Sequence, residues 1–251
     1  MIDLATEAAR RACRIMSDRP TLEVRHKGVV DLVTQVDLAC EEAIRSVLEP
    51  SGIPILAEEG GGSRSDTRWI VDPLDGTTNF VHGFPSYCVS IALQDQGELV
   101  LGVIGDPVHD RLFTARAGQG AFCNGERIRV SERDALAESL VASGFAYDRR
   151  ERAADYLRFV RALLETARGF RRAGAAAMDL AMVATGQLDG FWEFKLNAWD
   201  VAAGTLLVRE AGGCVTDMAG GELDLDAPRI LATNGRIHAA MTQVIEPLLP
   251  L

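Results

Sequence analysis

Two aspartates follow a short apolar run in the segment WIVDPLDGTTNF, at residues 69–80. Pro73 biases Asp72 toward an extended backbone, and Gly76 permits a tight turn before Thr77 opens a short helix. Carboxylate oxygens bind hard divalent cations, and backbone N–H groups at a helix start bind phosphate. Metal-assisted phosphoryl chemistry needs these two sites side by side. The same spacing is typical of an Asp-Gly turn with a capping threonine, so this segment alone leaves both interpretations open.

A second acidic group, Glu58-Glu59, ends the apolar run at residues 53–57 and precedes three glycines. If this run and the strand that ends at Asp72 finish at the same edge of a sheet, one of the two glutamates lies beside Asp72. The alternative is a pair of solvated loop charges, which is the common fate of adjacent glutamates.

Three more carboxylates are candidates, and each also has a purely structural interpretation. Thr34 and Asp37 have the spacing of a helix capping box. Asp200 follows Trp199 at the start of an apolar helix, where the helix dipole favours an acidic residue. Glu193 stands among aromatic residues in GFWEF, either as a strand-edge charge or as a ligand for substrate hydroxyl groups.

The elements that must position these residues divide the chain into two halves. The first half begins with two helices, the second of which ends at Pro50. Strands follow, and two of them form a hairpin across Gln96-Gly97. We predict these elements at residues 2–16 and 38–50 (helices), at 53–59, 68–73, 87–95 and 98–107 (strands), and at 117–128 (a further hairpin).

From about Ser139 the pattern changes to alternating strands and helices. We predict strands at residues 139–144, 188–193, 214–217 and 229–233, and helices at 151–167, 175–186, 199–213 and the C-terminus. The chain is therefore expected to form an N-terminal α+β subdomain over residues 1–135, with most of the metal ligands. A C-terminal α/β subdomain over residues 136–251 completes the active-site cleft, because such sites form preferentially between domains.

Composition narrows the class of protein. The chain has 251 residues, of which 47% are hydrophobic and 25% charged, an ordinary globular composition. The net charge of −10 disfavours nucleic-acid binding, which normally leaves a basic footprint. No apolar stretch is long enough to span a membrane, and the charged N-terminus lacks the pattern of a signal peptide. We expect a soluble cytoplasmic protein whose anionic substrate is attracted by bound cations.

The five cysteines are scattered, without a C-x-x-C pair, and the four histidines form no H-E-x-x-H motif. This distribution argues against disulfides and a zinc site, and we expect most cysteines to be small buried hydrophobic residues. A bound metal should therefore be a hard cation held by oxygen atoms.

Taken together, the order E-E, D-P-L-D-G-T-T-N-F and W-D-V-A-A-G resembles the inositol monophosphatase family, whose members are magnesium-dependent and lithium-sensitive phosphatases. The resemblance covers essentially the whole chain, with DLVT near the start and GAFCNG in the middle. The pair D-P-L-D-G-T and W-D-x-A-A-G at this separation is highly specific. The resemblance implies a mixed α/β fold of the sugar/inositol phosphatase type, a layered α-β-α-β-α sandwich, usually assembled as a homodimer.

The resemblance also implies a role for each candidate residue. Two to three Mg²⁺ ions would occupy the site. Asp72 would bridge the first and the second ion, and a third, more weakly bound ion would lie near Glu58. Thr77, assisted by Asp37, would orient and deprotonate a water molecule. Lys27 matches a basic position that the family often carries. The implied metal ligands are Glu58, Asp72, Leu74 (backbone carbonyl), Asp75 and Asp200; the implied catalytic residues are Thr77, Asp37 and Glu58; the implied substrate contacts are Gly76, Thr77, Gly174, Ala176, Glu193 and Asp200.

The substrate stays open within a class. Hydrolysis of inositol 1-phosphate is the leading expectation, since the TTNF ending favours inositol-phosphatase-like members over 3′-phosphoadenosine phosphatases, which tend to read TKEF. Fructose-1,6-bisphosphatase and histidinol-phosphate phosphatase are alternatives; Arg171 and Arg172 could bind a second phosphate, unless they are solvated surface residues. Gln119 replaces a lysine of some members. A non-catalytic regulator with the same fold is the alternative of another class, although such a protein would be expected to lose metal ligands.

Overall fold

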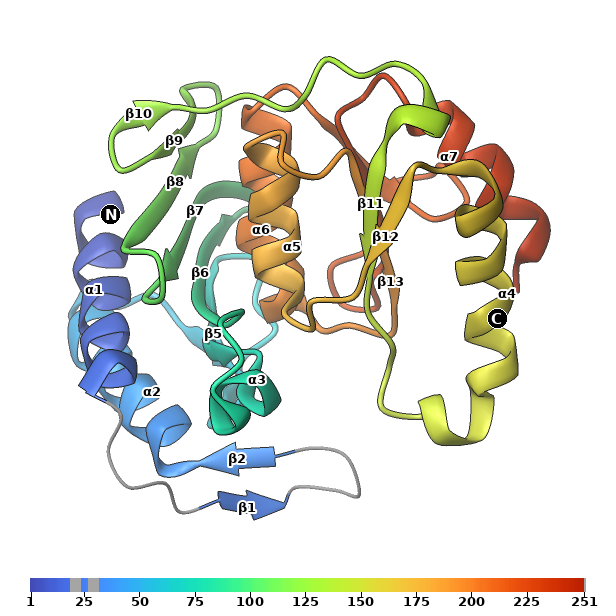
Figure 1. Cartoon of the computed structure of the whole chain (residues 1–251). Coiled ribbons are helices and arrows are strands. Elements are labelled where there is room, and N and C mark those ends of the chain that lie inside the picture. Colours follow the sequence, from blue (N-terminus) through green and yellow to red (C-terminus); the bar gives the residue numbers. More distant parts are fainter. Residues whose placement is uncertain (19–23, 27–31, 251) are drawn as a thin grey trace.

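Two β-sheets, with helices between them and on both outer faces, form the frame of the protein (Figure 1). The computed structural model describes residues 1–18, 24–26 and 32–250. Helices α1 and α2 cover the outer face of the larger sheet, α5 and α6 lie between the sheets, and α4 and α7 cover the outer face of the smaller one. This order confirms the expected mixed α/β fold and its α-β-α-β-α layers. The helices are α1 (Ile2–Asp18), α2 (Gln35–Leu48), α3 (Thr77–His82), α4 (Arg149–Thr166), α5 (Ala176–Ala184), α6 (Ala198–Glu210) and α7 (His238–Ile245).

The larger sheet has eight strands in the order β10-β9-β8-β7-β6-β5-β3-β4. Only β3 and β5 pair in parallel, and the other neighbours are antiparallel. The predicted hairpin across Gln96-Gly97 is confirmed, with β6 and β7 on either side. The strands are β3 (Ile55–Ala57), β4 (Gly61–Gly62), β5 (Arg68–Asp75), β6 (Cys88–Asp95), β7 (Glu98–Asp106), β8 (Arg111–Arg116), β9 (Gly120–Cys123) and β10 (Glu126–Arg127).

The smaller sheet has five strands in the order β12-β11-β13-β15-β14. Here β11 pairs in parallel with β12 and β13, whereas β15 is antiparallel to β13 and β14. A separate two-stranded sheet pairs β1 (Val24–His26) with β2 (Leu32–Thr34). The strands of the smaller sheet are β11 (Leu140–Ser143), β12 (Gly169–Arg171), β13 (Gly190–Phe194), β14 (Cys214–Asp217) and β15 (Arg229–Thr233).

Alternation along two buried strands decides which side chains face the space between the sheets. In β5, Trp69 and Val71 pack with α1 and α2, whereas Ile70 packs with the inner helices. In β13, Trp192 belongs to the outer core and Phe191 to the inner one. Because neighbouring strand residues point to opposite faces, Asp72 shares the inner face of Ile70, and Glu193 shares the inner face of Phe191.

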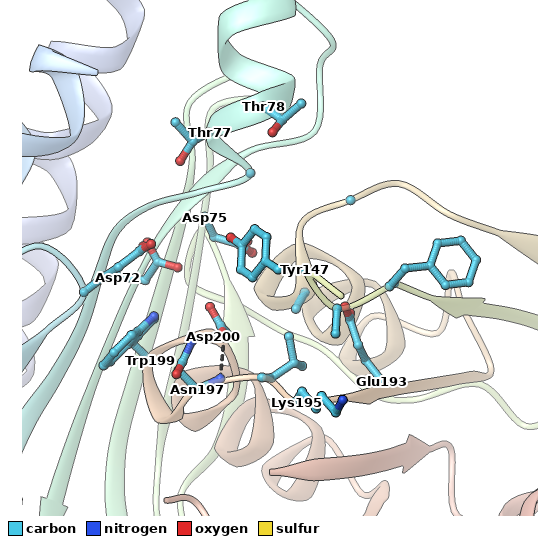
Figure 2. Close-up of a pocket in the computed structure, with 18 of the residues that line it drawn as sticks. Asp72, Asp75, Thr77, Thr78, Tyr147, Glu193, Lys195, Asn197, Trp199 and Asp200 are labelled. Carbon is cyan, nitrogen blue, oxygen red and sulfur yellow. Dashed lines mark hydrogen bonds between the residues drawn. The ribbon is translucent and has the colours of Figure 1, made fainter. Parts of the chain in front are cut away.

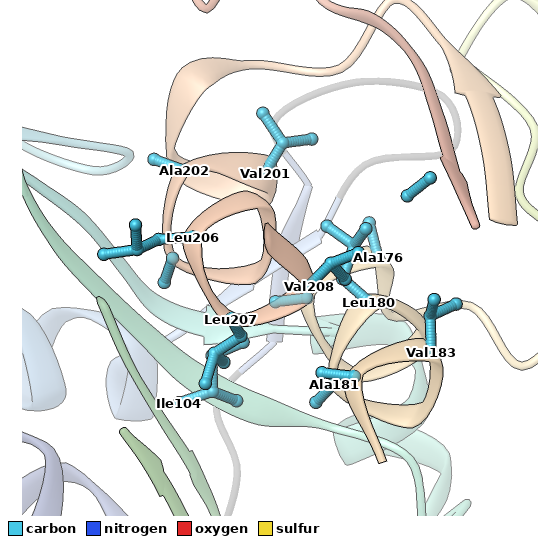
Figure 3. Close-up of a cluster of buried hydrophobic side chains, with 14 of the residues drawn as sticks. Ile104, Ala176, Leu180, Ala181, Val183, Val201, Ala202, Leu206, Leu207 and Val208 are labelled. Carbon is cyan, nitrogen blue, oxygen red and sulfur yellow. The ribbon is translucent and has the colours of Figure 1, made fainter. Parts of the chain in front are cut away.

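Helices α5 and α6 pack against each other and against the larger sheet (Figure 3). Both are rich in alanine and apolar on nearly every side, as expected for helices buried between two sheets. Gly204 of α6 lies where a Cβ would come within 2.5 Å of the Leu180 side chain of α5. The close approach of the two helices therefore depends on the missing side chain at this position.

The structure confirms most predicted elements and corrects some expectations. All of the predicted helices and strands are present, while β1, β2, β4, β8 and β12 were not separately predicted. Only Cys40 and Cys88 are buried, so the expectation for most cysteines was wrong. No helix in the described ranges has the length and apolarity to cross a membrane. The division into two subdomains near residue 135 stays a prediction.

Candidate active site

A cleft of about 340 Å³ lies between the carboxylate-bearing end of the larger sheet and the inner face of the smaller one. One wall comes from the ends of β3 and β5 and the start of α3. The other comes from the loop after β11, the segment before α5, β13 and the start of α6. Figure 2 shows acidic side chains from both walls in one space. The residues expected as metal ligands, catalytic residues or substrate contacts all line the cleft except Asp37, which lies behind Thr77.

Asp72 and Asp75 come from one strand, and a break in its pairing brings both to the cleft. Asp72 pairs with Ser90 and Asp75 with Cys88, with a register shift between them. Such an irregularity re-aims side chains at a strand end. Asp72 Oδ1 accepts a hydrogen bond of 3.0 Å from the amide of Leu74, so the turn is held by the carboxylate itself.

Burial and neighbouring negative charges act on Asp72. Its side chain is buried, and burial raises its pKa well above the ordinary value, with further increases from the charges of Glu58, Asp75 and Asp200. Glu58 and Asp75 lie on the same wall as Asp72, whereas Asp200 comes from the opposite wall and from a distant part of the sequence. All four carboxylates of the expected metal site line one cleft.

Asp75 is anchored by the opposite half of the protein. Its Oδ2 accepts 2.7 Å from the amide of Ala177, in the first turn of α5, and 3.8 Å from the thiol of Cys88. Burial raises the pKa of Asp75 to about 7 against these hydrogen bonds, and the charge of Glu58 adds to the rise. A helix start that donates to a carboxylate fixes its direction, so α5 orients this side chain.

Thr77 connects the cleft to Asp37 of α2. Thr77 Oγ1 is 3.0 Å from Asp37 Oδ1 and 3.2 Å from the carbonyl of Leu74. Asp37 Oδ2 accepts from the amide (2.8 Å) and the hydroxyl (2.6 Å) of Thr34, so the predicted capping box is confirmed. Burial raises the pKa of Asp37, while the hydrogen bonds from Thr34 and Thr77 lower it.

Gly76 begins α3 with a φ of +88°. A Cβ there would come within 2.9 Å of the Ser86 carbonyl oxygen and 3.2 Å of the Ala175 side chain. Only glycine combines this φ with this lack of space, which explains the glycine after Asp75.

Asp200 occupies the first turn of α6. Its Oδ2 accepts 2.6 Å from the amide of Asn197 (Figure 2), and both halves of a capping box are present. The Ser90 hydroxyl donates 3.0 Å to the Trp199 carbonyl, which ties this turn to the strand beside Asp72. The capping interpretation is therefore confirmed, and Asp200 also lines the cleft, while its role as a metal ligand stays a prediction.

Glu193 lies on a central strand, so of its two interpretations that of a strand-edge charge was wrong, and that of a ligand for hydroxyl groups stays a prediction. Its carboxylate packs against Gly144, where a Cβ would lie 2.2 Å from either oxygen. Burial raises the pKa of Glu193 well above the ordinary value; the charges of Asp179 and Asp200 raise it further, and that of Arg172 lowers it. A buried carboxylate that faces the cleft can accept hydrogen bonds from hydroxyl groups.

The lining of the cleft also includes Gly174, Ala176 and Arg172. Asn79 of α3 donates to the carbonyls of Ser86 (2.6 Å) and Ala173 (2.9 Å), which joins the two walls. Arg171 and Arg172 are both exposed, and only Arg172 lines the cleft, with its guanidinium 5.8 Å from the Phe145 ring centre.

The donor set fits a hard cation. It consists of oxygen atoms only, and the carboxylates raise one another's pKa values, a repulsion that a cation relieves. In the part of the chain that the structure describes, no three acidic, histidine or cysteine side chains are gathered tightly enough to enclose an ion. Mg²⁺ does not need such a cage, because it keeps several water ligands and uses one or two carboxylates together with substrate phosphate.

Several residues at the site were not predicted. They include Cys88 and Ala177, which hold Asp75, Ser90 beside Asp72, and Glu41 on α2. Lys195 lines the cleft with a φ of +54° and pairs with Asp148. Only Glu41 had a sequence signal, its spacing of four residues from Asp37 on a helix. Lys27 lies outside the described residues.

Comparisons with known proteins agree with this geometry. Residues 1–248 match the model of the inositol monophosphatase family. The chain is 44% identical to inositol-1-monophosphatase of Mesorhizobium japonicum, over 98% of this chain and 94% of that one. It is 43% identical to Nus factor SuhB of Pseudomonas aeruginosa, over 100% and 97%. The solved inositol monophosphatase of Anabaena superposes with a TM-score of 0.90 at 40% identity, over 100% and 96%. With this match along nearly its whole length, the chain belongs to the inositol monophosphatase family, phosphatases that act on phosphate monoesters.

Proposed function

We propose that this protein hydrolyses a small phosphate monoester with the help of Mg²⁺, and that inositol 1-phosphate is its substrate. The observation that carries the proposal is the meeting of Glu58, Asp72, Asp75 and Asp200 in one cleft, beside a threonine bonded to a buried aspartate. The relative named inositol-1-monophosphatase supports the substrate.

The four carboxylates and the Leu74 carbonyl would hold two to three Mg²⁺ ions. When bound, Mg²⁺ lowers the pKa of a water molecule and neutralises charge on the phosphate oxygens. Without such compensation these buried carboxylates would repel a phosphate dianion. The main task of the acidic residues is therefore to hold cations, and the positive charge of these cations would allow an acidic cleft to bind an anion.

Thr77 and Asp37 form a path for one proton. The Thr77 hydroxyl donates to Asp37 Oδ1, and its own oxygen faces the cleft, where it can accept a hydrogen bond from water. As the water attacks phosphorus, its proton passes to Thr77 Oγ1 while the threonine proton passes to Asp37. Burial raises the pKa of Asp37, which makes this carboxylate a better proton acceptor than an exposed one.

The alcohol moiety would lie between Glu193 and the segment that contains Gly174 and Ala176. Glu193 accepts hydrogen bonds from neighbouring hydroxyl groups, and Gly76 with Thr77 contacts the phosphate. Asp200 is close enough to Asp72 and Glu193 to affect both pKa values, so it serves the metal side and the alcohol side together.

The test is phosphate release from inositol 1-phosphate, fructose 1,6-bisphosphate and histidinol phosphate, with Mg²⁺ or with excess EDTA. We expect inositol 1-phosphate to be the best substrate, EDTA to abolish turnover and Mg²⁺ to restore it. Asp72→Asn should be the most damaging conservative change, because Asp72 would serve two ions, whereas Asp134→Asn at an exposed position should be silent. Full activity in EDTA would refute the metal-dependent mechanism.

Three finer properties belong to the same proposal. Lithium should inhibit the Mg²⁺-dependent reaction, which the same assay measures at millimolar lithium. The protein should be a homodimer, measured by light scattering, and should be found in the cytoplasmic fraction of its cells. Insensitivity to lithium, a monomer mass or recovery in another fraction would each refute the corresponding property alone.

Two observations keep other functions in view. Arg172 lines the cleft, which favours a second phosphate on the substrate and makes fructose 1,6-bisphosphate the necessary comparison. The relative named Nus factor SuhB favours a regulatory role through a partner. The Asp72→Asn variant separates the roles, since a regulatory function that needs no catalysis would survive this substitution in cells.

A further inference from the structure

Glu41 of α2 is a buried carboxylate outside the cleft that holds the turn after Glu58. Glu41 Oε2 accepts 3.0 Å from the amide of Glu59, and both of its oxygens lie 3.1 Å from the amide of Gly60. The side chain is 7% exposed. A carboxylate that accepts backbone N–H groups in a buried setting makes strong, directional hydrogen bonds.

Arg45 fixes this carboxylate from the other side. Its Nε donates 2.8 Å to Glu41 Oε1, one helical turn further along α2, and its Nη2 reaches the Gly61 carbonyl at 3.5 Å. A Cβ on Gly60 would lie 2.4 Å from Glu41 Oε1 and 2.7 Å from Arg45 Nη2. The glycine after the two glutamates therefore permits the backbone to approach the pair.

Glu58 is held on both sides as a result. Its own amide donates 3.2 Å to the carbonyl of Val71, the residue before Asp72, and the next two amides donate to Glu41. The turn can then place the Glu58 carboxylate beside Asp72, where its charge raises the pKa of Asp72. Without Glu41, the turn keeps the Val71 bond and the pairing of β3 with β4, but the amides of Glu59 and Gly60 lose the carboxylate that binds them to α2.

We propose that Glu41 is a positioning residue, which sets the affinity of the site for Mg²⁺ by fixing the turn that carries Glu58. The proposal rests on the proposed function, because it requires a metal site at Glu58 and Asp72. Asp37 and Glu41 lie four residues apart and are both buried, so they share one face of α2. A single helix thus orients the general-base threonine through Asp37 and a metal ligand through Glu41.

The experiment compares Glu41→Ala, Glu41→Gln and the control Glu42→Ala, an exposed neighbour on the same helix. Three quantities are measured: the Mg²⁺ dependence of p-nitrophenyl phosphate hydrolysis, the rise in melting temperature with Mg²⁺, and amide exchange of the 58–62 segment in EDTA. We expect Glu41→Ala to speed this exchange and to raise the Mg²⁺ concentration for half-maximal activity by about 10- to 100-fold, the usual effect of removing a residue that orients a ligand. Its kcat at saturating Mg²⁺ should stay close to that of the wild type, because a bound ion draws Glu58 back.

Glu41→Gln keeps one acceptor oxygen, so this variant should fold even if the alanine variant does not. Its increase in the Mg²⁺ concentration for half-maximal activity should be smaller than that of Glu41→Ala. The control should match the wild type in all three measurements. Faster exchange with an unchanged Mg²⁺ curve in both Glu41 variants would overturn the positioning role and leave the proposed function intact. A wild-type protein that shows no response to Mg²⁺ would overturn both.

Discussion

At the residue scale, the same carboxylates can serve a helix cap and a chemical site, because the two oxygen atoms are used separately. Asp37 Oδ2 accepts the hydrogen bonds from Thr34 in the capping box, and Asp37 Oδ1 accepts the hydrogen bond from Thr77. Asp200 likewise gives Oδ2 to the amide of Asn197 while it lines the cleft. Capping and chemistry, which compete as interpretations of the sequence, are compatible in the structure. Rigid capping also keeps each carboxylate in place for its second role.

Thr77 permits a direct test at this scale, because Gly76 rather than Thr77 is the N-cap of α3. Thr77→Ala should lower kcat by about 10²- to 10⁴-fold, the range for proton-transfer groups. It should lower the free energy of unfolding by about 1.5–3 kcal/mol, the value of one hydrogen bond to a charged group. Thr77→Ser keeps the hydroxyl and should retain most of the turnover. Steady-state kinetics at saturating Mg²⁺ and urea unfolding measure the two effects; an alanine variant with normal kcat would contradict the proton path.

Prediction from sequence reached the residues in motifs but not their supports. Asp72, Asp75 and Asp200 lie in sequence motifs that can be recognised without a structure. By contrast, the amide of Ala177 that holds Asp75 lies 102 positions away, and Ser90 reaches Trp199 across 109 positions. These contacts depend on how the two sheets pack, which local spacing does not encode.

At the element scale, periodicity was sufficient for long elements and failed for short ones. The apolar stripes of α1 and α2 and the alternation of β6 and β7 identify their elements. Strand β12 has only three residues, none of them buried, and β4 consists of two glycines. Such short edge strands exist because a neighbour pairs with them, so the sequence carries little sign of them.

The contact between α5 and α6 gives a prediction for these two elements. Gly204→Ala adds a methyl group that would meet Leu180 at 2.5 Å, and overpacking of this kind costs about 1–3 kcal/mol, offset by about 1 kcal/mol of helix propensity. We expect a net loss of stability in urea unfolding. In a Leu180→Ala background, which itself costs about 2–5 kcal/mol, the same methyl group has space and should stabilise the protein. A Gly204→Ala effect of equal size and sign in both backgrounds would refute this account of the helix contact.

At the scale of the whole molecule, the layer order came from the resemblance to a family rather than from the pattern of elements. Periodicity predicts strands and helices, but it does not say that α5 and α6 lie between two sheets. The physical sign was present: these helices have buried residues on all sides, unlike α1, whose buried residues form one stripe. A helix without a polar face needs cover on every side, which a layer between two sheets provides.

The whole molecule also bears the cost of its acidic cleft, and this gives a prediction for the metal-free protein. The pKa of Asp75 is raised to about 7 in the folded state, so the folded protein holds a proton that the unfolded chain has released above about pH 4. Stability from this group is complete below that pH and is lost as the pH rises toward 7. Asp75→Asn removes the charge. In EDTA, the melting temperature of the variant relative to that of the wild type should therefore rise between pH 4.5 and pH 8. Mg²⁺ should reverse the order at pH 8, since an ion present at 100 times its Kd stabilises the folded wild type by about 2.7 kcal/mol and the variant binds it less well. Calorimetry across this pH range measures the melting temperatures, and Asp134→Asn is the control for an exposed carboxylate. Parallel curves for the wild type and Asp75→Asn in EDTA would show that the charge of Asp75 does not destabilise the fold.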